Sequence, residues 1–164
     1  MNQQITIGSR NKMDFFDTIS LDQQLTIAIR IAIVAILASL IGWERDRAGK
    51  AAGTRTMALV GISSTLIVSI GEVLNTNFGM GDPTRALHAV VTGIGFLGAG
   101  LIFTTRKSNE TQGVTTAATV FTTACMGIAV GLGFLFTAIF FTLVTVIVLR
   151  STHLMDRAQR KLQD

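Results

Sequence analysis

Residues 41–56 read IGWERDRAGKAAGTRT, and this charged, glycine-containing stretch separates two long apolar runs, 25–43 and 56–74. Four of the 14 Lys and Arg residues of the chain lie in it, beside Glu44 and Asp46. Each apolar run is close to the roughly 20 residues that a helix needs to cross a lipid bilayer. The stretch therefore predicts a charged hairpin at a membrane surface, between two transmembrane helices.

Three further apolar runs follow, and each is again long enough for a crossing; they are 86–103, 114–130 and 132–149. Backbone N–H and C=O groups find no water in lipid, so a helix is the expected form of every run. The last two runs together are too long for one crossing, so we expect a tight hairpin at residues 131–133. The sequence predicts an all-α membrane protein, a bundle of five transmembrane helices over residues 25–150.

Residues 1–24 are polar, and we expect them to lie at the membrane interface or to be disordered. Ser20 followed by Gln23 has the form of a capping box ahead of the first apolar run. That run is long enough to remain as an anchor, so we expect no cleaved signal sequence.

Positive charge is distributed unequally between the two sides that this topology defines. Ten Lys and Arg residues fall in segments 44–55, 104–113 and 150–164, whereas three fall on the other side. Segments rich in Lys and Arg stay in the cytoplasm. We therefore expect the N-terminus outside, the C-terminus in the cytoplasm, and a short basic cytoplasmic tail at 151–164.

Several classes of function are excluded by composition and motifs. The net charge is +4, but the basic residues form short clusters between apolar runs, so we expect no nucleic-acid partner. Residues 93–98 match the dinucleotide pattern GxGxxG, yet they lie inside an apolar helix and follow no strand. His88, His153 and the single Cys125 form no cluster of metal ligands. We predict no catalytic residue, no metal site, no cofactor and no enzymatic activity.

Small residues four positions apart mark helix faces that can approach closely in a membrane. The predicted helix at 86–103 and the part of the next helix at 115–127 have the highest density of small and hydroxyl residues. We therefore place these two helices at the centre of the bundle, with packing contacts at Gly93, Gly95, Gly98, Gly100, Thr116 and Ala118. The last helix carries four Phe residues, and we predict that it is an outer, lipid-facing member.

Charged residues near the predicted helix ends are the candidate functional residues. Arg30 lies about a turn and a half inside the first helix, where an unpaired charge is costly. It either extends to the lipid headgroups or pairs with Glu72, which the topology places at a similar depth. Asp82 and Arg85 lie near the same outer side.

On the predicted inner side, Glu44 and Arg45 end the first helix and face Arg55 at the start of the second. They act either as ordinary anchors of the topology or as pairs that fix the shape of the hairpin.

These residues belong to a longer pattern, which comprises Arg30, Gly42-x-Glu44-Arg45, Ala52-Gly53-x-Arg55-Thr56, GIGFLGAG at 93–100 and GVTTAAT at 113–119. The pattern, in this order over about residues 25–150, resembles the MgtC/SapB family of bacterial inner-membrane proteins. The resemblance implies a multi-pass protein of the inner (plasma) membrane with an MgtC-like domain at 25–150.

The same resemblance implies a link to magnesium limitation and, in pathogens, to survival inside host cells. Direct magnesium transport is not established for the family, and the competing view is regulation of other membrane proteins, with the ATP synthase or an ion transporter as candidate partner. The chain departs from some members in two ways. It stops about fourteen residues after the last helix, where they continue into a soluble domain, and it has Phe121-Thr122 where they have Trp-Cys.

Two functions stay open. The first is a non-enzymatic regulator that acts through helix contacts within the bilayer, supported by the small-residue faces. The second is a channel or transporter for magnesium or another ion, acting as a homo-oligomer. A magnesium path would need several oxygen ligands near the midplane, where Glu72 is the one acidic candidate and the Thr hydroxyls of 114–130 are neutral ones. We favour the regulator.

Overall fold

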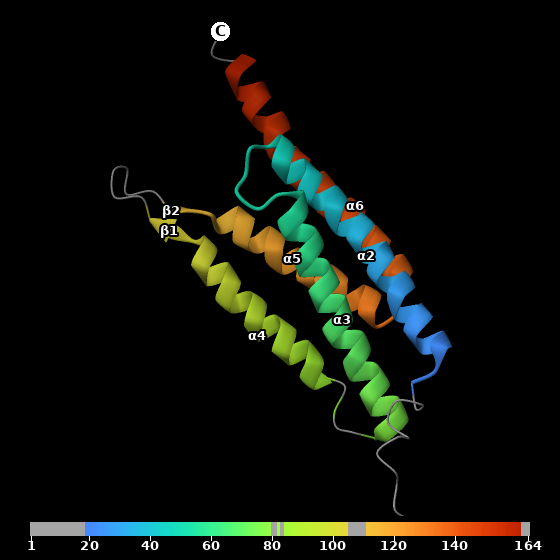
Figure 1. Cartoon of the computed structure of the whole chain (residues 1–164). Helices are drawn as coiled ribbons and strands as arrows, with labels where there is room; N and C mark the ends of the chain where they lie inside the picture. Colours follow the sequence, from blue (N-terminus) through green and yellow to red (C-terminus); the bar gives the residue numbers. More distant parts are fainter. Residues whose placement is uncertain (1–18, 80–81, 83, 105–110, 162–164) are drawn as a thin grey trace, which may run out of the picture.

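The computed structural model describes residues 19–79, 82, 84–104 and 111–161, which form five helices and one pair of short strands (Figure 1). The helices are α2 (Leu21–Arg47), α3 (Thr54–Phe78), α4 (Thr84–Leu101), α5 (Val114–Gly131) and α6 (Leu135–Lys161). The strands β1 (Phe103–Thr104) and β2 (Thr111–Gln112) pair antiparallel between α4 and α5. Most of the polar segment predicted at 1–24 lies outside the described residues.

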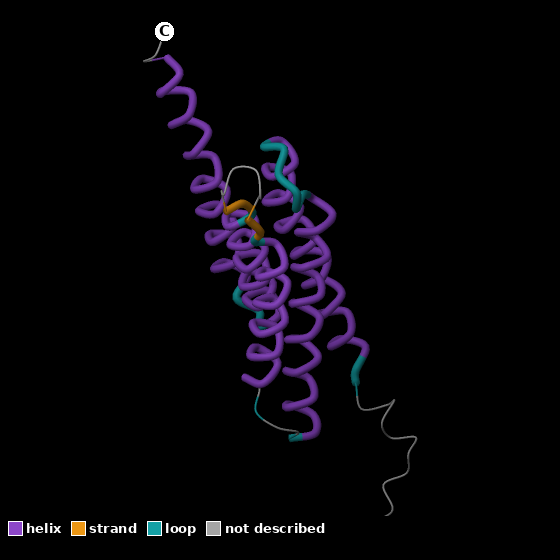
Figure 2. The backbone as a smooth tube through the Cα atoms, turned by 90° about the vertical axis from the view of Figure 1, so that its left-hand side faces the viewer, coloured by secondary structure: helices purple, strands orange, loops and turns teal. Residues whose placement is uncertain are grey.

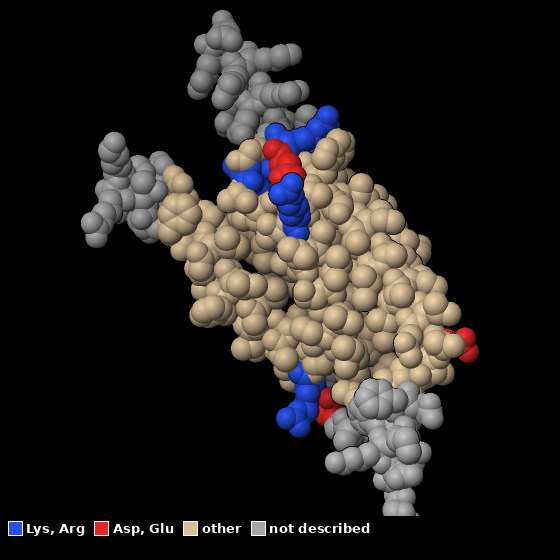
Figure 3. All heavy atoms as spheres, in the orientation of Figure 1, with Lys and Arg blue, Asp and Glu red and all other residues tan. Residues whose placement is uncertain are grey.

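Four of these helices, α2 to α5, are long and apolar enough to cross a membrane. The apolar part of α6, Leu135–Ser151, is shorter. On the face drawn in Figure 3, a broad band free of Lys, Arg, Asp and Glu separates two charged ends. The all-α membrane class is confirmed, and the count of five crossings stays a prediction.

The helices run alternately up and down, so the connections gather at two ends of the bundle (Figures 1 and 2). The α2–α3 loop, the β1–β2 pair and the end of α6 lie at one end, here called the hairpin end. The start of α2 and the α3–α4 connection lie at the other, here called the Arg30 end. The described parts of the three segments counted above, 44–55, 104–113 and 150–164, thus lie at the same end, and the orientation relative to the membrane stays a prediction.

Both ends of α2 follow from local chemistry. The Ser20 hydroxyl accepts from the Gln23 N–H at 3.2 Å, and the Gln23 side chain accepts from the Ser20 N–H, which confirms the capping box. At the other end Gly49 has a φ of 65°, and the N–H groups of Gly49 and Lys50 bond back to the carbonyls of Asp46 and Arg45. This is the Schellman ending that glycine favours. The helix therefore continues to Arg47, past the predicted end of the apolar run.

The core confirms the central place of α5, which packs against each of the other four helices. It contributes to two clusters of buried apolar side chains. One includes Val34 and Ile41 of α2 with Met126 and Val130 of α5. The other joins α3, α4 and α5 through side chains such as Met57, Val68, Val90, Ile94 and Val120.

Contact between α3 and α5 is close because glycines and hydroxyls line it. The Thr65 hydroxyl donates to the Gly127 carbonyl at 2.8 Å. A Cβ added at Gly127 would lie 2.7 Å from the Gly61 carbonyl oxygen, so any larger residue would push the two helices apart. In a membrane, hydroxyl side chains can join two helices by hydrogen bonds without placing a charge in the lipid.

The predicted central position of 86–103 is wrong, because α4 lies at the edge of the bundle (Figure 1). It packs mainly on α5 through one stripe, with Val90 and Ile94 as its buried residues. A Cβ at Gly93, Gly95 or Gly100 would meet no described atom within 4 Å, and only Ala117 approaches Gly98, at 3.9 Å.

Among the residues that the structure describes, nothing therefore packs on Gly93, Gly95 or Gly100 as predicted, and Ala118 of α5 is exposed. The reason is that small residues permit close helix contact without requiring it, since lipid covers an unpacked face at little cost. Thr116 of α5 is buried, in line with its prediction. The Phe residues of the last helix point outward, as predicted for Phe134, Phe136, Phe140 and Phe141.

Candidate functional sites at the two ends of the bundle

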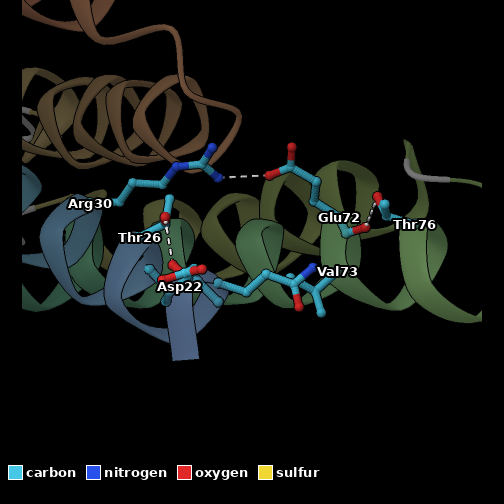
Figure 4. A pocket seen from close by; sticks show the side chains of 8 residues that line it. Asp22, Thr26, Arg30, Glu72, Val73 and Thr76 are labelled. Carbon is cyan, nitrogen blue, oxygen red and sulfur yellow. Dashed lines mark hydrogen bonds and ion pairs between the residues drawn. The ribbon is translucent and has the colours of Figure 1, made fainter. Parts of the chain in front are cut away.

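At the Arg30 end, an ion pair joins α2 to α3. The Arg30 Nη1 lies 2.7 Å from Glu72 Oε2 and donates a hydrogen bond to it. Figure 4 shows the two side chains reaching toward each other from their helices. The Arg30 side chain is 19% exposed and the Glu72 side chain 42%, so the pair is partly solvated. Pairing, the alternative to extension toward the headgroups, is confirmed.

Arg30 also contacts the third helix of this region. Its Nη1 donates to the carbonyl of Gly131, the last residue of α5, and the Ser69 hydroxyl donates to the same oxygen at 3.3 Å. The C-terminus of a helix carries partial negative charge, which favours a guanidinium there. Gly133, with a φ of 85°, turns the chain beside this guanidinium. Arg30 thus ties α2, α3 and α5 together, and its contact with the Gly131 carbonyl, which Ser69 shares, was not anticipated.

A cavity of about 260 Å³ opens beside this ion pair, lined by both of its side chains and by residues of α2 and α3 such as Asp22, Thr26, Val73 and Thr76 (Figure 4). Gln23 also lines the cavity, and its side-chain amide and that of Asn77 bond each other in both directions, at 3.0 and 3.1 Å. Most of the lining residues have polar side chains and the Glu72 side chain is 42% exposed, so water can reach the ion pair.

Asp82 and Arg85, predicted near the same side, belong to the start of α4. The Asp82 carboxylate accepts from the Thr84 N–H at 2.8 Å. This hydrogen bond from the backbone lowers the pKa of Asp82 below its ordinary value. Arg85 is exposed. Their geometry is that of a helix cap.

At the hairpin end, Glu44 and Arg45 are almost completely buried, with 4% and 3% of each residue exposed. Arg45 Nη2 donates to the Thr116 hydroxyl of α5 at 3.4 Å. Buried charges are costly unless they are paired and hydrogen-bonded, so a simple anchor role in the headgroups does not fit. Arg55 is exposed and forms no ion pair with a described residue, so it does not make the predicted pairing across the hairpin.

The hairpin is held instead by Asp46, which accepts from the N–H of Thr54 at 3.0 Å and from its hydroxyl at 2.6 Å. Two glycines make room for this contact. A Cβ at Gly53 would lie 1.6 Å from Asp46 Oδ1, and a Cβ at Gly42 would lie 2.4 Å from Thr54 Cα. The predicted candidate Gly53 is thus required by the shape of the loop, whereas the role of Asp46 was missed.

At each end an arginine side chain bonds groups on neighbouring helices. Arg30 bonds the Glu72 carboxylate and a backbone carbonyl, and Arg45 bonds the Thr116 hydroxyl. Within the described part of the chain, no group of three or more His, Cys, Asp or Glu residues could hold a metal ion. The one acidic side chain expected on an ion path, Glu72, is bonded to Arg30. The arrangement favours joining helices over coordinating a cation.

Apolar helices with charges held at their ends define a multi-pass α-helical membrane protein. The chain belongs to the MgtC family, whose model matches residues 31–158. It is 37% identical over 130 residues to YhiD of Escherichia coli K12, a match that covers 76% of this chain and 60% of that protein.

Two other relatives carry family names. The chain is 32% identical over 129 residues to SapB of Bacillus subtilis, with 73% of this chain and 55% of that protein covered. It is 38% identical over 98 residues to MgtC of Brucella abortus, with 60% and 39% covered. The chain therefore spans about 60% or less of these relatives' lengths. No solved structure matches it.

Proposed function

We propose that this chain is a protein of the bacterial inner membrane that takes part in magnesium homeostasis and regulates another membrane protein by contact between helices. Membership of the MgtC family supports the first part. YhiD carries a name that proposes it as a magnesium transporter, and another relative is named MgtC. The contact mechanism is supported by the surface of α4.

The proposed orientation has five crossings, with the N-terminus outside and the hairpin end in the cytoplasm. The charges around the α2–α3 loop support it, since Arg45, Arg47, Lys50 and Arg55 lie at that end. In this orientation α6 is the fifth crossing, and it extends past the other helices on the cytoplasmic side (Figure 2).

The observation that carries the contact mechanism is a groove between α3 and α4. It has a volume of about 370 Å³, and its lining includes Ser63 and Ser64 of α3 with Ala89 and Gly93 of α4. No charged residue lines it, so the occupant that fits is an apolar helix. Small and hydroxyl residues are the kind that let a second helix approach closely in a bilayer.

The occupant that we propose is a transmembrane helix of another, ion-handling membrane protein. Within the chain, α4 uses one stripe of side chains and leaves Gly93 unpacked. A second copy of this chain is the competing occupant, and the experiment below separates the two.

The test is recovery of partner proteins from magnesium-starved cells, using the tagged full chain. Gly93→Leu places an apolar side chain at the groove, and its Cβ would have no described atom within 4 Å. Ala32→Leu on the exposed face of α2 is the matched control. We expect Gly93→Leu to lose a membrane-protein partner that the wild type and the control retain. Equal recovery from all three, or recovery of only a second copy, would contradict the proposal.

The competing function is ion transport, and the cavity at the Arg30 end with Asp22 and Glu72 in its lining is what favours it. The purified chain in liposomes decides between the two. We expect no magnesium or proton flux from it alone. Reproducible flux that Glu72→Ala abolishes would establish the transporter instead.

A further inference from the structure

A second, larger cavity lies at the hairpin end and has no part in the contact mechanism. Its volume is about 590 Å³, within the range of ligand sites. It is lined by the end of α2 and the α2–α3 loop on one part, and by the end of α4, the two short strands and the start of α5 on the other. Two regions about fifty residues apart in the sequence, 45–51 and 100–116, therefore meet at one open space at the membrane surface.

The first sign of a ligand is Arg45. Its side chain lines the cavity although only 3% of the residue is exposed. Nη2 donates to the Thr116 hydroxyl, but Nε has no hydrogen-bond partner among the residues that the structure describes. A buried guanidinium N–H without an acceptor is unfavourable, and such groups in native proteins indicate an acceptor that the structure does not contain.

The second sign is the N-terminus of α5. Its cap, Gly113, has a φ of 87° and offers no side-chain acceptor. The first bond within the helix runs from the Ala117 N–H to the Gly113 carbonyl. The N–H groups of the three residues between them, 114–116, thus have no acceptor within the helix, and all three residues line the cavity. Free N–H groups and the helix dipole together favour an anion.

The third sign is the balance of charge. Lys50 of the α2–α3 loop lines the cavity with Arg45, and none of the described lining residues is acidic. Glu44, the buried neighbour of Arg45, is not in the lining. The carbonyl end of α4 also reaches the cavity at Leu101, but this oxygen packs against Gly113, 1.8 Å from where a Cβ would lie. Two cations and a helix N-terminus therefore face the cavity, with the Thr115 and Thr116 hydroxyls beside them.

From these contacts we infer that the cavity binds a phosphate group. Arg45 Nε, the α5 N-terminus and Lys50 supply several donors, two of them charged, which suits the several acceptor oxygens of a phosphate. Two sources share this chemistry. One is the headgroup of an anionic phospholipid in the adjacent leaflet, and the other is a soluble phosphate.

The test uses the purified full chain, with two probes. One is a nanodisc of phosphatidylcholine containing phosphatidylglycerol, with the retained lipid counted by native mass spectrometry. The other is inorganic phosphate, measured by calorimetry. The variants are Arg45→Gln and the exposed Lys50→Gln. The control is Arg47→Gln, which removes an equal charge from the same end but from outside the cavity, where Arg47 stacks on the Trp43 ring at 4.3 Å.

We expect Arg45→Gln and Lys50→Gln each to weaken binding about tenfold, and Arg47→Gln to leave it unchanged. If the cavity variants retain less phosphatidylglycerol than the wild type, the ligand is a lipid headgroup. If they bind inorganic phosphate more weakly, the ligand is a soluble phosphate. Absence of binding to both probes, or an equal loss in Arg47→Gln, would overturn the inference. Should Arg45→Gln fail to fold, Lys50→Gln decides, because its exposed side chain is not part of the core.

Discussion

Helices α4 and α5 have similar compositions and opposite positions. Both have 18 residues and are rich in Gly, Ala and Thr, yet α5 contacts every other helix whereas α4 lies at the edge. The glycines explain the difference. Gly127 of α5 lies against the backbone of α3, whereas Gly93 of α4 has open space where a Cβ would lie. A small residue thus marks either a contact within the chain or a surface left for another chain.

The largest effect that this comparison predicts comes from adding one methyl group to each helix. We expect Gly127→Ala to lower the free energy of unfolding by about 1–3 kcal/mol, because its Cβ would overlap the Gly61 carbonyl. Gly93→Ala should leave stability unchanged or slightly raised, since Ala forms helix better than Gly. Unfolding by a denaturing detergent measures both, and equal losses would break the comparison.

A smaller effect concerns the ion pair that attaches the end of α5. We expect Arg30→Ala to cost more stability than Glu72→Ala, because Arg30 also donates to the Gly131 carbonyl. The coupling energy between them should be about 0.5–1 kcal/mol, modest because the Glu72 side chain is 42% exposed. The same unfolding assay on the double variant measures it. Strictly additive single losses would show that the pair contributes no coupling.

The smallest effect is a pH dependence confined to the start of α4. The pKa of Asp82 is lower in the folded state, so its ionised carboxylate stabilises the folded state at pH values above 3.8, the ordinary pKa of the group. This stabilisation is lost as the pH falls below that value. We therefore expect the protection of amides from hydrogen exchange, relative to the intrinsic exchange rate at each pH, to fall in acid in the first turn of α4 but not of α5. Asp82→Asn should abolish this loss of protection. An unchanged acid response in that variant would assign it to another group.

Much of the architecture could be predicted from the sequence. The lengths of the apolar runs predicted the helices, and the glycines at 131 and 133 predicted the turn between α5 and α6. The depth of Arg30 and Glu72 along antiparallel helices was enough to pair them, because topology alone fixes which side chains can meet. The Ser20 capping box needed only its local spacing.

The position of each helix within the bundle was harder to predict from the sequence. Density of small residues did not distinguish α4 from α5, because the distinction depends on which carbonyl or side chain lies opposite each glycine. The acceptor of Arg30 on α5 is a backbone carbonyl, and a carbonyl at Gly131 carries no signal in the sequence. Asp46 was overlooked because its partner, Thr54, becomes a neighbour only after the loop has folded.

The claim that the α3–α4 groove receives a helix of another protein can be tested most directly by photo-crosslinking in living cells. A photoreactive residue would replace Leu97, which lines the groove, or as a control Phe136, which is 83% exposed on α6. We predict that Leu97 crosslinks to a specific membrane protein in magnesium-starved cells and that Phe136 does not. Identical crosslinks from both positions, or crosslinks from Leu97 only to a second copy of this chain, would contradict the account.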